Sequence, residues 1–240
     1  MARLRVGVVG LDRRWRAALR PEARAVTGEG IIELLRRPGI DAIILGRAWF
    51  GLWPLPHAIE AGKPVLCLAD PLADEAVLDE IAGRDAGIRY EPWPSLGLVE
   101  RSLGMVGEPL RLQASCTGLP ETRLLALLGF VGRLLGEAPS MRKHGPCLAL
   151  DHDSRKRSLF LLGEGPEPSC HLRIEGEGGS VSVEMPSQLS WRDGAGRQER
   201  SLPSSLARSA VLEAFLADVR AGRPMGGIGP ALGWLRQARG

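Results

Sequence analysis

The strongest constraint on this chain lies at its start, where a short apolar segment runs into a glycine turn. Residues 4–9 are mostly apolar, and Gly7 and Gly10 follow the spacing of a G-x-x-G-x-G turn. Such a turn brings the N-terminus of the next helix against the pyrophosphate of a dinucleotide. Asp12 stands where the last glycine belongs. Its carboxylate would occupy the space of the phosphates and repel them, at roughly 4 kcal/mol for a like-charge pair about 4 Å apart at an effective dielectric of about 20.

The turn therefore predicts a cofactor site that has been altered. Arg13 and Arg14 follow directly and would offset part of the repulsion. We take the remnant of the turn as the set of candidate cofactor-binding residues and expect it to bind a dinucleotide weakly or not at all. This set comprises Gly7, Gly10, Leu11, Asp12 and Arg13.

Composition restricts the class of protein. The chain has 240 residues, of which 44% are hydrophobic, enough for one large core or two modest ones. A net charge of +3 is too small to indicate a nucleic-acid partner, and no apolar run approaches the length of about 18 residues that a membrane span needs. We expect a cytoplasmic protein without nucleic-acid or membrane partners. Its scattered cysteines are expected to be reduced thiols: Cys67, Cys116, Cys147 and Cys170.

The order of the predicted elements divides the chain into two domains of an α/β protein. Residues 1–106 alternate strand and helix signals, which predicts a shortened Rossmann-like parallel sheet. Residues 107–240 predict an α+β domain with an open mixed, mainly antiparallel sheet. Strands are expected at 4–9, 23–26, 41–45, 64–68, 88–90, 110–116, 147–150, 158–162, 170–175, 180–185 and 188–192, and helices at 13–19, 30–36, 53–60, 74–84, 121–135, 204–221 and 230–238.

Several short motifs, in the same order, resemble the Gfo/Idh/MocA oxidoreductases, the family of glucose-fructose oxidoreductase and inositol dehydrogenase. Residues 5–11 match the first strand and turn of that family. Residues 61–67 followed by 71–73 are similar to its A-G-K-x-V-x-C-E-K-P-L-A motif, and residues 215–224 to a late helical segment. The resemblance implies NAD or NADP in the first domain, a sugar-like substrate, a lysine of the E-K-P motif that aids proton transfer, and dimers through the open face of the second sheet.

The chain departs from the family at the residues that carry the chemistry. The lysine position falls on Ala69 or Asp70, and neither supplies a cation. The helix over 121–135 has no histidine and no acid after its first turn, and residues 46–51 lack the histidine of the family's T-P-x-x-x-H segment. The second strand is followed by Thr27 instead of an acid for the adenosine ribose. We therefore expect a catalytically degenerate member that acts as a binding or structural subunit, with no cofactor.

Two alternatives remain open. The first is a working NAD(P)-dependent oxidoreductase on a sugar-like or polyol substrate, with a rearranged site in which Asp70 or Glu121 is the acid-base group. The second is a small-molecule-binding module that uses the old substrate cleft. Aromatic residues mark this cleft: Trp49, Phe50, Trp53 and Trp93.

A group of potential metal ligands lies around one predicted strand. His144, Cys147, Asp151, His152 and Asp153 have the right chemistry. Successive residues of a strand face opposite sides, so the spacing does not gather them, and we expect no metal.

The residue pattern of the second sheet predicts that another protein chain covers one of its faces. Its strands alternate apolar and polar residues, as at Val181 and Val183 or Leu172 and Ile174, and the predicted helices suffice to cover one face only. Exposed apolar surface of several hundred Å² is unusual on a monomer. We expect a homo-oligomer, or a complex with a paralogue, through this sheet.

Overall fold

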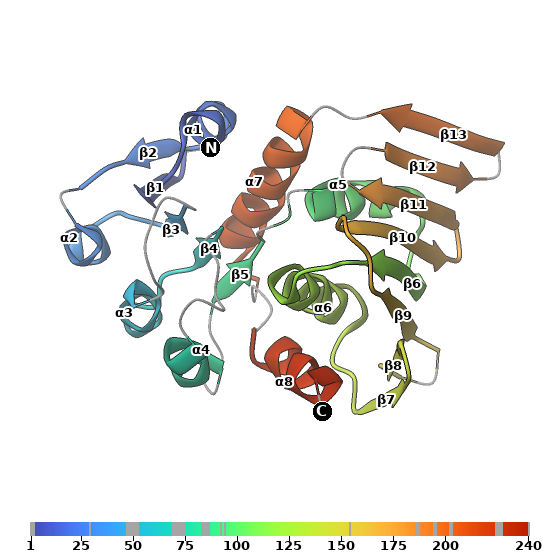
Figure 1. Ribbon diagram of the computed structural model, residues 1–240. Helices are drawn as coiled ribbons and strands as arrows, with labels where there is room; N and C mark the ends of the chain where they lie inside the picture. Colours follow the sequence, from blue (N-terminus) through green and yellow to red (C-terminus); the bar gives the residue numbers. More distant parts are fainter. Residues whose placement is uncertain are drawn as a thin grey trace.

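Two β-sheets with helices between them make up the fold in the computed structural model (Figure 1). The structure describes residues 3–28, 30–46, 53–68, 75–82, 87–91, 93, 95–153, 155–185, 188–193, 196–201, 204–223 and 228–239. In this part of the chain, no helix combines the length and the apolar composition needed to cross a membrane.

The first sheet is parallel and has the strand order β2-β1-β3-β4-β5. β3 and β4 are buried along their whole length, as expected for central parallel strands with helices on both faces. The order reverses between β1 and β3, which lie side by side and are followed by connections in opposite directions. The Rossmann-like sheet predicted from the sequence is thus confirmed. Its strands are β1 (Arg5–Val9), β2 (Arg24–Val26), β3 (Ala42–Leu45), β4 (Val65–Cys67) and β5 (Ile88–Tyr90).

Helices from both ends of the chain cover the first sheet. α1 (Arg13–Leu19) and α7 (Ser204–Ala221) pack on one face, where Val6 and Val8 of β1 meet Phe215 of α7 in one core. α2, α3 and α4 cover the other face, and α8 lies beside α4 and β5 (Figure 1). The two helices that follow the second sheet in the sequence therefore return to the first. The remaining bounds are α2 (Ile31–Arg36), α3 (Pro54–Glu60), α4 (Glu75–Ala82) and α8 (Ile228–Arg239).

The second sheet has the order β13-β12-β11-β10-β6-β9-β8-β7 in the described residues. Only β6 and β9 pair in parallel among them, so the mixed, mainly antiparallel sheet is confirmed as well. α5 (Ser95–Ser102), with a short 3-10 turn after it (Leu103–Met105), and α6 (Glu121–Leu135) lie between this sheet and the first one (Figure 1). The strands are β6 (Pro109–Thr117), β7 (Ser140–His144), β8 (Cys147–Asp151), β9 (Arg157–Gly163), β10 (Ser169–Gly176), β11 (Gly179–Met185), β12 (Gln188–Asp193) and β13 (Gly196–Ser201).

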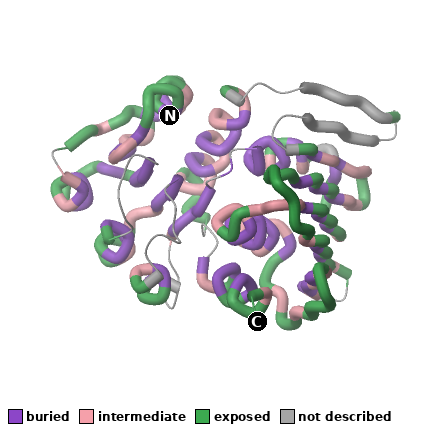
Figure 2. The backbone as a smooth tube through the Cα atoms, in the orientation of Figure 1, coloured by how far each residue is buried: buried purple, intermediate pink, exposed green. Residues whose placement is uncertain are grey.

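The two faces of the second sheet differ in burial (Figure 2). Val181 and Val183, on which the expectation of an uncovered apolar face was based, are buried on the face that the helices cover. That reasoning was wrong in detail because these residues, like Leu172 and Ile174, point to the covered side. The other face, the open face, carries mostly polar side chains where the burial of its residues is described, and Leu159 and Leu161 are exposed on it, 42% and 51% accessible. Association through the open face stays a prediction.

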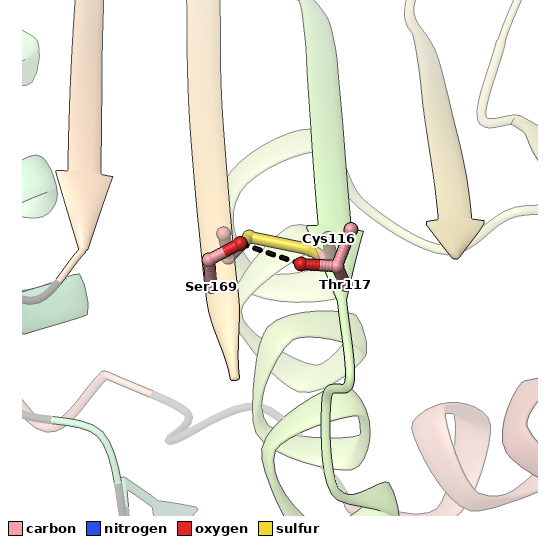
Figure 3. Close-up of a disulfide and its surroundings, with 4 residues drawn as sticks. Cys116, Thr117 and Ser169 are labelled. Carbon is pink, nitrogen blue, oxygen red and sulfur yellow. Dashed lines mark hydrogen bonds between the residues drawn. A yellow bond between two sulfur atoms is a disulfide. The ribbon is translucent and has the colours of Figure 1, made fainter. Parts of the chain in front are cut away.

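A disulfide joins the two central strands of the second sheet, β6 and β10 (Figure 3). Cys116 and Cys170 are register partners in this antiparallel pair, with Cα atoms 4.1 Å apart. Beside them, the hydroxyl groups of Thr117 and Ser169 share a hydrogen bond of 2.7 Å (Figure 3). The expectation of four reduced thiols is therefore wrong for this pair. Cys67 and Cys147 are not part of a disulfide.

Candidate functional site

The switch point between β1 and β3 forms the first part of the candidate site. In open α/β sheets, ligands bind outside the carboxyl ends of the strands where the strand order reverses. Gly10 has a φ of +61°, which favours glycine, and turns the chain out of β1. Gly46 follows β3 and donates its N–H to the carbonyl of Val9 at 2.8 Å. A Cβ at Gly46 would collide with the Gly10 carbonyl and lie 2.7 Å from the Cα of Leu11, so the two carboxyl ends touch through backbone.

Asp12 caps the helix that begins at this turn. Its Oδ1 accepts hydrogen bonds from the backbone N–H groups of Arg14 at 2.8 Å and Trp15 at 3.0 Å. These N–H groups are among those that a helix N-terminus offers to an anion, and the carboxylate also complements the positive end of the helix dipole. Leu11 and Trp15 are buried and hold α1 on the sheet. The protein's own carboxylate thus engages two of the N–H groups at this helix N-terminus.

Other residues predicted at the turn have separate roles. Gly7 lies within β1, where a Cβ would come within 2.6 Å of the Cδ1 of Ile43, so this glycine permits close packing of β1 on its neighbours. Arg13 opens α1 with an exposed side chain. Asp70, Trp49 and Phe50 lie outside the described residues.

The remaining predicted cleft and catalytic residues lie in three separate parts of the chain. Trp53, next to α3, is 44% accessible and makes an edge-to-face contact with His57, with ring centroids 6.3 Å apart. Trp93 is buried, and the guanidinium carbon of Arg123 lies 5.3 Å from its ring centroid. Glu121 forms an exposed ion pair with Arg239 that ties the start of α6 to the end of α8. Each of these three side chains has a different partner, His57, Arg123 or Arg239.

The second part of the candidate site is a buried ion cluster that the sequence analysis missed. It contains five charged side chains from β5, the residue after it, and three helices: Arg89, Glu91, Glu100, Arg133 and Asp218. Arg89 is fully buried and contacts both carboxylate oxygens of Glu100, with Asp218 at 3.4 Å and Glu91 at 3.7 Å. Arg133 donates to Glu91 at 3.0 Å.

This ion cluster connects the two halves of the molecule. Arg89 and Glu91 extend from β5 of the first sheet, while Glu100 and Arg133 belong to α5 and α6, which pack on the second sheet. Asp218 comes from α7. A cavity of about 200 Å³, lined by Glu100, Arg133 and apolar side chains, reaches the cluster. The Oε1 of Glu91 and the Nε atoms of both arginines have no hydrogen-bond partner within the described structure.

Glu91 is the member of the cluster whose carboxyl group has a pKa near neutral pH. Burial raises the pKa of its carboxyl group to about 7, although Arg133 and Arg89 each pull this pKa down. Because the usual pKa is 4.5, the folded protein holds this proton over a pH range in which the unfolded chain releases it. The carboxyl end of β5 thus carries a group that changes charge near neutral pH.

We expect Glu91 to make stability depend on pH in a defined direction. A carboxyl with a raised pKa contributes its full stability below pH 4.5, and this contribution is lost as pH rises to about 7. The shift corresponds to a loss on the order of 3 kcal/mol. Urea unfolding at about pH 5 and about pH 8 measures it, and Glu91→Gln should flatten the difference. An equally large difference in the Glu91→Gln variant would contradict this assignment.

The potential metal ligands do not converge. His144 and Cys147 face each other across the β7–β8 hairpin, and Asp151 is engaged by Arg142 and Arg157. His152 is buried, with Nδ1 2.7 Å from the Gly136 carbonyl and Nε2 2.9 Å from the Ser158 hydroxyl. Burial lowers the pKa of His152, in keeping with a neutral ring. The described residues contain no group of three or more histidine, cysteine, aspartate or glutamate side chains placed to hold a metal ion.

Sequence reasoning found one part of the site and missed the other. Asp12 stands out because it interrupts a glycine pattern. The only local signal for the ion cluster was the pair Arg89 and Glu91, two opposite charges two residues apart and therefore on one side of a strand. Their partners lie as far along the chain as Asp218. Residue spacing predicts contacts between near neighbours in the sequence only, so it did not predict these ion pairs.

Solved structures of similar architecture include proteins named as dehydrogenases or oxidoreductases. No protein-family model and no curated protein matches the sequence. A dehydrogenase (MviM) from Clostridium difficile is 10% identical, with 98% of this chain and 97% of that chain covered and a TM-score of 0.61. UDP-N-acetylglucosamine 3-dehydrogenase GnnA from Acidithiobacillus ferrooxidans is 16% identical, with coverage of 100% and 97% and a TM-score of 0.57. An oxidoreductase from Agrobacterium radiobacter, solved with NAD+, L-tartaric acid and magnesium, is 14% identical, with coverage of 99% and 96% and a TM-score of 0.56.

These similarities extend over the whole chain and concern the fold. They confirm the two-domain fold that the resemblance to the Gfo/Idh/MocA family implies.

Proposed function

We propose that this protein is a binding or partner subunit built on an oxidoreductase fold, and that its β1–α1 turn does not hold a nicotinamide dinucleotide tightly. The observation that supports this proposal is the cap formed by Asp12. A phosphate at the turn would have to displace the carboxylate from the N–H groups of Arg14 and Trp15 and then lie next to its charge.

The rest of the first sheet supports the same proposal. β2 is the edge strand and ends at Val26, so no acidic residue follows it directly where a ribose would be held. In the strand order usual for dinucleotide-binding domains, a further strand lies outside β2. The described sheet has none at that position. The adenosine half of a cofactor would therefore find fewer contacts here than the fold normally offers.

A second candidate is the NAD(P)-dependent oxidoreductase acting on a sugar-like or polyol substrate. The comparisons favour it over the first, because the three solved structures are named as dehydrogenases or oxidoreductases and one holds NAD+. For this function the chain needs a proton-transfer group in place of the missing lysine. Asp70 and Glu121 are the candidates for this group.

Titration of the purified protein with NADH and NADPH separates the two candidates. We expect no saturation below the millimolar range for either cofactor. We also expect no change in the absorbance of the reduced cofactor with sugars, inositols or their keto forms, since loss of acid-base help alone costs about 10² to 10⁴ in rate. A dissociation constant in the low micromolar range for NADH or NADPH would contradict the first candidate, the binding or partner subunit. Turnover by the wild type that Asp70→Ala abolishes would establish the second.

A further inference from the structure

The open face of the second sheet holds a cavity that the proposed function does not use. It measures about 820 Å³ and lies over β6, β8, β9 and the end of β10; we call it the open-face pocket. Its charged lining consists of four arginines and two carboxylates: Arg111, Arg142, Arg155, Arg157, Asp151 and Glu175. The pocket thus has two positive charges in excess.

The two carboxylates are already engaged. Asp151 accepts from Arg142 at 2.7 Å through one oxygen and lies 3.2 Å from the Nε of Arg157 through the other. Glu175 pairs at 2.7 Å with Arg173, which is not part of the pocket lining. Arg111 forms no ion pair among those found in the described residues, although Glu175 is its register partner on β10. The side chain of Arg157 is 71% exposed.

Strand register brings two of these arginines together. Arg111 of β6 and Arg157 of β9 are register partners on adjacent strands, and both are exposed on the open face. The two guanidinium groups repel each other across this pair of strands, and the register partners on the outer sides, Glu175 for Arg111 and Asp151 for Arg157, offset part of this repulsion. An anion between the two guanidinium groups removes this repulsion and accepts charge-assisted hydrogen bonds from both. Ala149 and Leu159 add an apolar part to the pocket wall.

We propose that the open-face pocket is a binding site for a small molecule with at least two negative charges, phosphate or carboxylate groups on a compact body, held between Arg111 and Arg157. The volume suits a molecule of metabolite size. A second copy of this chain fits the pocket less well. Two-fold association centred on it would place the same excess of arginines on both sides, and like-charge contacts across an interface cost several kcal/mol.

Calorimetric titration with inorganic pyrophosphate and, separately, with citrate tests the proposal on the full-length protein at constant ionic strength. Pyrophosphate represents the phosphate source and citrate the carboxylate source. We expect saturable binding of at least one of them, weakened about tenfold or more by Arg111→Gln and by Arg157→Gln. The matched control is Arg36→Gln, which removes one exposed arginine from α2, far along the chain from the pocket, and should leave binding unchanged.

A further variant separates this site from the cofactor turn. Arg13→Gln removes a positive charge beside Asp12 and should also leave the binding of both anions unchanged. If Arg13→Gln weakens binding as much as Arg111→Gln, the anion lies at the turn and the proposal fails. It fails equally if neither anion binds, or if the protein sediments as a dimer that excludes both. NADH binding does not enter this test, so its outcome is independent of the proposed function.

Discussion

Replacing Asp12 with glycine is expected to strengthen the binding of NADH by about a hundredfold or more. The change removes both the charge and the side chain that occupies the N-terminus of α1. A repulsion of roughly 4 kcal/mol per like-charge pair corresponds to about a thousandfold in affinity, and Arg13 and Arg14 reduce this gain. Glycine is itself an acceptable N-cap and costs the helix only a few tenths of a kcal/mol. Fluorescence titration with NADH measures the effect.

A second substitution at the same position divides the effect into charge and occupancy. Asp12→Asn removes the charge but keeps a side-chain oxygen that can accept from the N–H groups of Arg14 and Trp15. We expect its affinity for NADH to lie between those of the wild type and Asp12→Gly. Asp41→Asn is the matched control, since Asp41 accepts from the backbone of Arg5 near the start of β1. Equal affinities in all four proteins would contradict the role assigned to Asp12.

Arg89→Met is expected to lower the free energy of unfolding by about 3–5 kcal/mol, the range found when one partner of a buried ion pair is removed. The side chain of Arg89 is fully buried among Glu91, Glu100 and Asp218, and its loss leaves three carboxylates with Arg133 as the remaining cation of the cluster. Chemical denaturation measures the loss. The methionine fills a similar volume, so the change tests charge more than packing.

An exposed ion pair between α5, the helix that carries Glu100, and α7 serves as the control for this prediction. Arg101 lies 3.4 Å from Glu213, with side chains 55% and 40% accessible. Pairs of this kind contribute about 0–1 kcal/mol, so Arg101→Met should have a small effect. Similar losses in the Arg89→Met and Arg101→Met proteins would mean that the buried ion cluster does not hold the two halves of the molecule together.

Elements with an apolar pattern were predictable from the sequence, and elements without one were not. The run Ala42–Leu45 and the helix Glu121–Leu135 signal their structure by composition alone, and the structure contains both. β7 (Ser140–His144) and β13 (Gly196–Ser201) were missed because each is a polar edge strand joined to the sheet by backbone pairing with one neighbour. α5 was missed because Gly97 interrupts its helical pattern. A side chain at this position would clash with α7, because a Cβ there would lie 2.6 Å from the Cγ2 of Val211.

The same distinction applies to the candidate site. Asp12 was identifiable because a local pattern defines what belongs at its position, and the structure adds that its carboxylate caps α1. The pairing of Cys116 with Cys170 depends on strand register, which nothing in the spacing of the two residues reveals. The open-face pocket depends in the same way on the register between Arg111 and Arg157. Long-range register is the information that the sequence analysis lacked.

The return of α7 to the first sheet has a consequence for the way the chain is made. The last strand of that sheet ends at Tyr90, yet the helix that covers Val6 and Val8 begins only at Ser204. Proteins emerge from the ribosome N-terminus first, and their domains usually fold in that order. Here the first sheet leaves the ribosome with one apolar face covered by α1 but not yet by α7, and this lasts until the whole second sheet has been synthesised. The core of the first sheet is therefore completed only after α7 has been synthesised.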